Sequence, residues 1–191
     1  VPFKTPWRTV QLADEAGKLI ESSMILNLNE PDTLTDDSWI RPMKYIGIWW
    51  GMHIGKYTWK AGPKHGATTA NTKRYIDFAA DNSIPGVLVE GWNKGWENWV
   101  DGVEFDFLHA YDDYNLAEVA AYAKNRGVHL IAHNETAANA EWYEKQADTA
   151  FGLYQSLGIH AIKTGYVGKM RPLGQYHHGQ WMVNHQALRS E

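Results

Sequence analysis

Two carboxylates and two tryptophans form a candidate site for cleaving a sugar bond. Glu90 and Glu135 each follow an apolar run of strand length, and Trp49 and Trp92 lie at or just beyond the ends of such runs. Glycoside hydrolysis needs one protonated carboxyl to protonate the leaving oxygen and one carboxylate to activate water or to attack the sugar. Tryptophan rings add flat apolar surfaces on which pyranoses stack. Glutamates at loop starts and tryptophans in cores are also common, so a purely structural role stays open for each.

His133 and Lys163 extend this candidate site. His133 lies two positions before Glu135, and Lys163 lies near the end of the last apolar run. An ammonium group that faces a protein interior must be paired or must meet a ligand, so we expect a glutamate or a sugar hydroxyl beside Lys163. The chain has no cysteine and no H-E-x-x-H motif, and we therefore expect no zinc centre and no metal ligand among its residues.

The elements that must position these side chains follow from four apolar runs, at residues 45–50, 86–90, 128–133 and 159–164. Each run predicts a strand, and a segment with helical spacing follows it. Alternation of nearly continuous apolar strands with helices is typical of parallel βα units, so the predicted fold class is α/β. Functional groups of such folds gather at the carboxyl ends of the strands, which is where the candidate residues lie.

Three helices are predicted after the first three strands. The first has its apolar face over residues 72–79, and the second begins at Asn115 and ends at Gly127. The third repeats apolar residues from 143 to 157 and stops at Gly158. A fourth and less regular helix is predicted over residues 174–188.

The number of βα units predicts about half of a (β/α)₈ barrel. The strands begin about 30 to 40 residues apart, so eight units would need roughly 300 residues. We therefore interpret residues 1–44 as a lead-in segment and residues 45–191 as units 1–4 of a barrel. Half a barrel leaves two open sheet edges. The chain is then either a segment of a longer polypeptide or a subunit that completes its sheet with another chain, such as a second copy of itself; a small open doubly wound domain is the alternative.

The amino-acid composition limits the classes of partner that the chain can bind. The chain has 18 Lys and Arg against 22 Asp and Glu, a net charge of −4, without a basic cluster. This balance argues against nucleic acid as a partner. No apolar run approaches the length of a membrane span, and the first residues lack the order of a signal peptide. The 10 tryptophans and 10 tyrosines suit a core, an interface or a sugar-binding cleft.

Six sequence blocks carry a resemblance to a known family. In chain order they are Pro-Trp-Arg at 6–8, Ser-Trp-Ile-Arg-Pro at 38–42, Glu-Gly-Trp at 90–92, His-Asn-Glu-Thr at 133–136, Lys-Thr-Gly-Tyr-Val-Gly at 163–168 and Gln-Trp-Met-Val-Asn-His at 180–185. In identity, order and spacing they resemble the first half of the catalytic barrel of glycoside hydrolase family 97. The resemblance covers nearly the whole chain.

The resemblance implies a bacterial α-glycosidase that is periplasmic or exported, with a β-sandwich before the barrel, a β-domain after it and a calcium ion in its active site. In the inverting α-glucosidase branch, the glutamate of the His-x-Glu-Thr block is a catalytic base, which corresponds to Glu135. His133 and Lys163 correspond to residues that contact the sugar. The retaining branch has an aspartate nucleophile two residues after this lysine, where this chain has Gly165.

The general acid and the calcium ligands of the family correspond to positions outside this chain. We therefore expect the 191-residue chain alone to have little or no hydrolase activity, because general acid catalysis is typically worth about 10²–10⁴-fold. The expected ligand is an α-glucoside or an α-linked oligosaccharide, with Glu90, Trp92 and Trp49 as further substrate-binding candidates. The alternative function is a carbohydrate-binding module without catalysis.

Overall fold

The computed structural model describes residues 7–28, 34–101, 104–137 and 139–165. The chain divides into two compact units, Val1–Arg41 and Pro42–Glu191. The first unit contains one short α-helix, α1 (Ala16–Ile20), and one 3₁₀ turn, η1 (Leu26–Leu28), among its described residues. The candidate residues all belong to the second unit.

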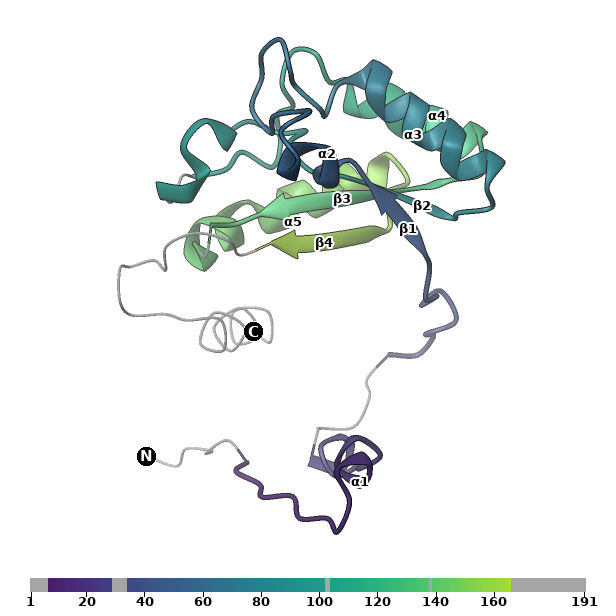
Figure 1. Cartoon of the computed structure of the whole chain (residues 1–191), viewed down its shortest axis with the longest axis vertical. Helices are drawn as coiled ribbons and strands as arrows, with labels where there is room; N and C mark the ends of the chain where they lie inside the picture. The colour runs from purple at the N-terminus through teal and green to yellow at the C-terminus, as the bar shows by residue number, and fades with distance from the viewer. Residues whose placement is uncertain (1–6, 29–33, 102–103, 138, 166–191) are drawn as a thin grey trace. The chain divides into compact units, whose positions relative to one another are not determined.

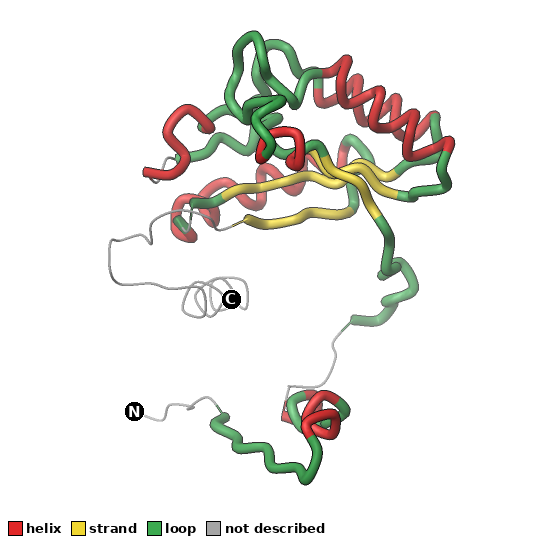
Figure 2. The backbone as a smooth tube through the Cα atoms, viewed as in Figure 1, coloured by secondary structure: helices red, strands yellow, loops and turns green. Residues whose placement is uncertain are grey.

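The second unit is built on a parallel sheet whose strand order follows the chain order (Figures 1 and 2). Its strands are β1 (Tyr45–Gly47), β2 (Gly86–Val89), β3 (His129–Glu135) and β4 (Ala161–Gly165). The register pairs His133 with Lys163 and Glu135 with Gly165. The predicted α/β class with parallel βα units is therefore confirmed.

Helices connect the strands and cover the sheet. In chain order they are α2 (Trp49–His53), α3 (Thr69–Asp81), the 3₁₀ helix η2 (Trp96–Asp101), α4 (Leu116–Asn125) and α5 (Ala140–Ser156). Helices α3 and α4 lie side by side and contact strands β1 to β3 (Figure 1). Strand β2 is buried along its whole length, as expected for a strand covered on both faces.

The predicted helix ends are confirmed where the structure describes them. The Asn115 side chain accepts a hydrogen bond from the Glu118 amide over 3.0 Å and so caps the start of α4. Gly127 and Gly158, which follow α4 and α5, adopt φ values of +69° and +73°, which favour glycine. The helix predicted over residues 174–188 lies outside the described residues.

The first strand is shorter than the predicted run 45–50. It ends at Gly47, and Trp49 and Trp50 begin helix α2 instead of ending the strand. The reason is local: the buried residue Ile48 adopts helical backbone angles, with φ −78° and ψ −23°, and the Trp49 ring then folds back onto Gly47, where an added Cβ would lie 3.0 Å from the Trp49 Cδ1.

Two long loops lie beyond the carboxyl ends of β1 and β2. The first closes on itself because the Thr58 amide donates to the Lys64 carbonyl over 2.8 Å and the Gly66 amide donates to the Thr58 carbonyl over 3.0 Å. The second, between β2 and α4, carries η2 and the buried residues Phe105 and Phe107. Among the described helices, none is both long and apolar enough to cross a membrane.

Candidate active site

A cavity of about 370 Å³ lies at the carboxyl ends of the strands. Five of the six predicted site residues line it, namely Trp49, Glu90, His133, Glu135 and Lys163. The remaining lining residues are His53, Trp59, Trp96, Trp99, Thr164 and Gly165. The strand ends therefore bring the predicted polar groups together, while their catalytic or binding roles stay predictions.

Glu90 is the polar centre of this cavity. Its Oε2 accepts a hydrogen bond of 3.1 Å from the indole N–H of Trp59. Its Oε1 lies 3.6 Å from the His133 Nε2 and 3.7 Å from the Lys163 Nζ. Lys163 thus has the neighbouring glutamate that the sequence predicted, although 44% of its side chain is exposed. An exposed ammonium head beside a carboxylate can still donate to a ligand hydroxyl.

His133 is a buried and neutral imidazole. Burial lowers the pKa of His133 to about 4, with the Lys163 ammonium acting in the same direction and Glu90 opposing it. Its ring lies against Trp96, with ring centroids 6.0 Å apart and planes at 29°. Its Nδ1 is buried without a hydrogen-bond partner among the described residues. With Nε2 at the cavity, the neutral ring can donate or accept one hydrogen bond there, according to its tautomer.

The lowered pKa of His133 predicts acid sensitivity of the fold. Because the pKa is lower in the folded than in the unfolded state, the contribution of His133 to stability is complete above pH 6.5 and is lost as the pH falls towards 4. Between pH 7 and pH 5 the wild-type protein is expected to lose about 2 kcal/mol more unfolding free energy than His133→Gln. Denaturant titrations of the full-length natural protein at the two pH values measure this difference.

His129→Gln is the matched control for that experiment. His129 lies on the same strand but is exposed, so its replacement should leave the acid sensitivity unchanged. Equal pH dependence in wild type and His133→Gln would contradict a neutral, buried His133.

Glu135 is held by the turn that follows β3. Its side chain is buried at 3% exposure, and its Oε1 accepts a hydrogen bond of 2.8 Å from the Ala137 amide. The same turn is tied to β4, because the Thr136 amide and hydroxyl both donate to the Gly165 carbonyl, over 3.1 and 2.7 Å. A Cβ added at Gly165 would overlap Oε2 of Glu135. The carboxylate therefore occupies the space that any side chain at position 165 would need.

Tryptophans that the sequence analysis did not single out form one wall of the cavity. Trp59 and Trp96 stack with ring centroids 6.2 Å apart and planes at 10°. The ring centroid of Trp99 lies 5.7 Å from that of Trp59 and 5.8 Å from that of Trp96. His53 contacts Trp59 edge-on at 5.2 Å. The high tryptophan content was the signal for such a wall, but these residues lie in loops and a short helix, where strand-end reasoning does not place them.

Trp92 was predicted as a stacking wall, and the structure places it in the core instead. Only 2% of it is exposed, and its indole N–H donates to the His133 carbonyl over 3.0 Å. Gly91 adopts φ +83° directly after Glu90, and this turn directs the next side chain between Tyr114 and Tyr154. Trp92 therefore supports the backbone of His133 and does not line the cavity.

Trp49, the other predicted stacking residue, does line the cavity, but it does so from helix α2 and not from a strand end.

The described residues do not form a calcium site on their own. Calcium takes six to eight oxygen ligands, and within the described ranges no group of three or more His, Asp or Glu side chains could hold a metal ion. The Glu90 carboxylate, moreover, already faces an indole N–H, an imidazole and an ammonium.

Comparison with protein families gives two matches. A family model described as Glycoside hydrolase 97 matches residues 49–190, and one described as Glycosyl-hydrolase 97 N-terminal matches residues 1–31. Among curated proteins, a retaining alpha-galactosidase from Bacteroides thetaiotaomicron is 24% identical over 171 residues, which are 88% of this chain and 23% of that protein. A probable retaining alpha-galactosidase from Streptomyces bingchenggensis is 28% identical over 169 residues, 86% of this chain and 24% of that protein.

Proteins with solved structures include relatives of higher sequence identity than these two curated proteins. A glycoside hydrolase family 97 enzyme from Pseudoalteromonas sp. strain K8, in complex with acarbose, superposes with a TM-score of 0.77 and is 52% identical. The same values apply to its E480Q form in complex with panose. The match covers 82% of this chain and 24% of that enzyme. This chain thus spans about a quarter of the length of these relatives.

Proposed function

Because this chain belongs to glycoside hydrolase family 97, we propose that it contributes the first four βα units of a (β/α)₈ catalytic barrel that hydrolyses α-glucosides with inversion. Residues 45–191 would form these units, and residues 1–44 would lead into them. Strands β1 and β4 are the edges of the described sheet, and the other half of the barrel would pair with them. Family resemblance also supports an exported or periplasmic protein.

The observation that carries the proposal is the position of Glu135 beside Gly165. The family's retaining branch needs an aspartate side chain at position 165, and here the Glu135 carboxylate fills that space. The buried Glu135 carboxylate can take a proton from a water molecule. Gly165 has no side chain that could act as the nucleophile. The two residues together therefore favour single-step inversion.

In this mechanism, Glu135 accepts a proton from a water molecule on the face of the sugar opposite the leaving group. The water oxygen bonds to the anomeric carbon as the bond to the leaving oxygen breaks. A second carboxyl group, from a part of the protein beyond this chain, donates its proton to that oxygen. Inverting enzymes place the two carboxyls about 6.5–9.5 Å apart, which leaves room for the water.

The other cavity residues would bind and orient the sugar. The Lys163 ammonium and the neutral His133 ring would hydrogen-bond sugar hydroxyls, and Glu90 would accept from a hydroxyl while it aligns both groups. Trp59, Trp96 and Trp99 also line a second cavity of about 520 Å³ next to Lys60 and Lys64. Further units of an oligosaccharide would lie there, against the same three tryptophans.

An α-linked glucose oligosaccharide is the proposed substrate. The relative at 52% identity was solved with acarbose and with panose, whereas the relatives named retaining alpha-galactosidases are 24% and 28% identical. An α-galactosidase is the second candidate function. The relatives of that name are called retaining, and Gly165 supplies no side chain that could act as a nucleophile.

The stereochemistry of the product tests the proposal. The full-length natural protein is incubated with panose, with an aryl α-glucoside and with an aryl α-galactoside, and the first product anomer is followed by proton NMR. We expect hydrolysis of the glucosides with β-glucose appearing first. Release of α-glucose first, or cleavage of the galactoside alone, would overturn the proposal.

A further inference from the structure

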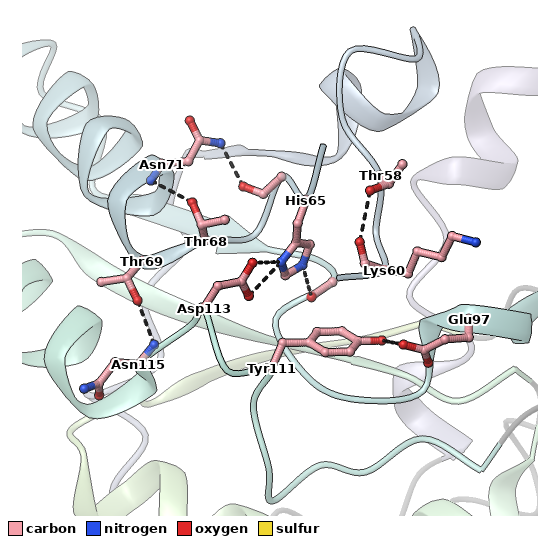
Figure 3. Close-up of polar contacts among 12 residues, drawn as sticks. Thr58, Lys60, His65, Thr68, Thr69, Asn71, Glu97, Tyr111, Asp113 and Asn115 are labelled. Carbon is pink, nitrogen blue, oxygen red and sulfur yellow. Dashed lines mark hydrogen bonds and ion pairs between the residues drawn. The ribbon is translucent and has the colours of Figure 1, made fainter. Parts of the chain in front are cut away.

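His65 is a buried residue that does not line the cavity of the candidate active site. None of its side chain is exposed. Its Nδ1 lies 2.9 and 2.8 Å from the two carboxylate oxygens of Asp113, and its Nε2 lies 2.9 Å from the carbonyl oxygen of Gly91 (Figure 3). The ring also meets Tyr111 edge-on, with centroids 5.2 Å apart.

Both ring nitrogens of His65 face acceptor oxygens. The Gly91 carbonyl oxygen can only accept a hydrogen bond, so Nε2 donates to it, and the Asp113 carboxylate holds the ring from the other side. Asp113 is 41% exposed, so water solvates the far side of the pair. Tyr111, the third group that faces the ring, donates its own hydroxyl to Glu97 over 2.7 Å and makes only an edge-on ring contact with His65.

The carbonyl that His65 holds belongs to the turn that orients Glu90. Gly91 follows Glu90 directly and adopts φ +83°. A Cβ added at Gly91 would lie 2.8 Å from the Trp59 carbonyl oxygen, so the turn packs directly against the backbone of Trp59. Trp59 in turn donates its indole N–H to the Glu90 Oε2. His65 thus connects the loop that carries Trp59 to the turn that carries Glu90.

We propose that His65 is a positioning residue: held by Asp113 at one ring nitrogen, it donates from the other to the Gly91 carbonyl and thereby holds Glu90 against Trp59 and towards Lys163. The expected effect on kcat rests on the proposed function. The inference goes beyond that function because His65 does not line the cavity and, in the proposed mechanism, does not contact the sugar.

A pair of substitutions separates this role from a general loss of structure. In His65→Gln, the amide nitrogen can still donate to Gly91, but the amide oxygen faces the Asp113 carboxylate, and two acceptors then oppose each other. We expect kcat for an aryl α-glucoside to fall about 10- to 100-fold in the full-length natural protein, the range that a small misplacement of a site produces. In Asp113→Asn, the asparagine amide can donate to the His65 ring while the ring still donates to Gly91, so the loss of kcat should be smaller than in His65→Gln.

The double variant His65→Gln with Asp113→Asn provides the decisive comparison. The asparagine N–H then donates to the glutamine oxygen, and the glutamine N–H donates to Gly91. We expect kcat to return to within about threefold of the wild type, a coupling that independent sites do not show. A double variant as impaired as His65→Gln, or a His65→Gln variant with wild-type kcat and KM, would overturn the proposal.

Two readouts do not depend on turnover. Nitrogen-15 NMR of histidine-labelled protein should show a proton on the Nε2 of His65, whose signal is identified by its loss in His65→Gln. Crystal structures should show the Trp59 to Glu90 hydrogen bond broken in His65→Gln and restored in the double variant. A His65 Nε2 that carries no proton in the wild type, or an intact bond in His65→Gln, would refute the proposal. If the wild type cleaves no α-glucoside, the proposed function fails while these readouts still decide the role of His65.

Discussion

Replacing Glu135 by glutamine is expected to lower kcat for panose by about 10²–10⁴-fold, the usual contribution of a general base. The glutamine oxygen can still accept the hydrogen bond that the Ala137 amide donates to Oε1 of Glu135, so the turn should keep its shape. What is lost is the capacity to take a proton from water. Steady-state kinetics of the full-length natural protein measure the change, and calorimetric titration with panose should show nearly unchanged affinity.

Glu141→Gln is the matched control, because Glu141 is an exposed residue in the first turn of α5. It should leave both kcat and affinity at wild-type values. If Glu135→Gln instead lost affinity and kept its turnover, Glu135 would be a sugar-binding residue and a different group would activate the water.

Gly165→Ala is expected to reduce kcat by about 10²-fold, chiefly because it displaces the Glu135 carboxylate. The added Cβ would overlap the Glu135 Oε2 and would lie 3.2 Å from the His133 Nε2. Because the carboxylate cannot remain in place, the proton acceptor moves out of line with the water. Kinetics on the aryl α-glucoside, together with a crystal structure of the variant, test both the loss and its cause.

Gly152→Ala serves as the control for that substitution. Gly152 lies on helix α5, and an added Cβ would meet no atom within 4 Å, so alanine should stabilise the helix by up to about 1 kcal/mol and leave kcat unchanged. A Gly165→Ala enzyme with full activity would show that Glu135 does not act from the position seen here.

The sequence predicted the sheet and helices because their signals are local. Apolar runs mark β2 and β3, and the cap at Asn115 together with the glycine at 127 marks both ends of α4. Strand ends in a parallel sheet share one edge, so Glu90, His133, Glu135 and Lys163 could be expected at the same cavity from their positions alone. The prediction was wrong for the end of β1, where Ile48 turns the chain into a helix.

The aromatic wall could not be predicted from the sequence in the same way. Trp96 begins the 3₁₀ helix η2, whose start is tied to Tyr111. The Tyr111 hydroxyl accepts a hydrogen bond from the Trp96 amide and donates one to Glu97. Such contacts join residues that no local pattern relates. Trp92 shows the opposite error: it is two positions from Glu90, yet the left-handed conformation of Gly91 sends its side chain into the core.

The agreement between strand order and chain order has a consequence for biosynthesis. Each strand pairs with the strand made just before it, so the sheet can grow by one βα unit at a time as the chain leaves the ribosome. The bonds from Thr136 to the Gly165 carbonyl, however, cannot form until β4 has been synthesised. The turn that holds Glu135 therefore gains these two hydrogen bonds only after β4 has joined the sheet, whereas the bond from the Ala137 amide to Glu135 is local and needs no further strand.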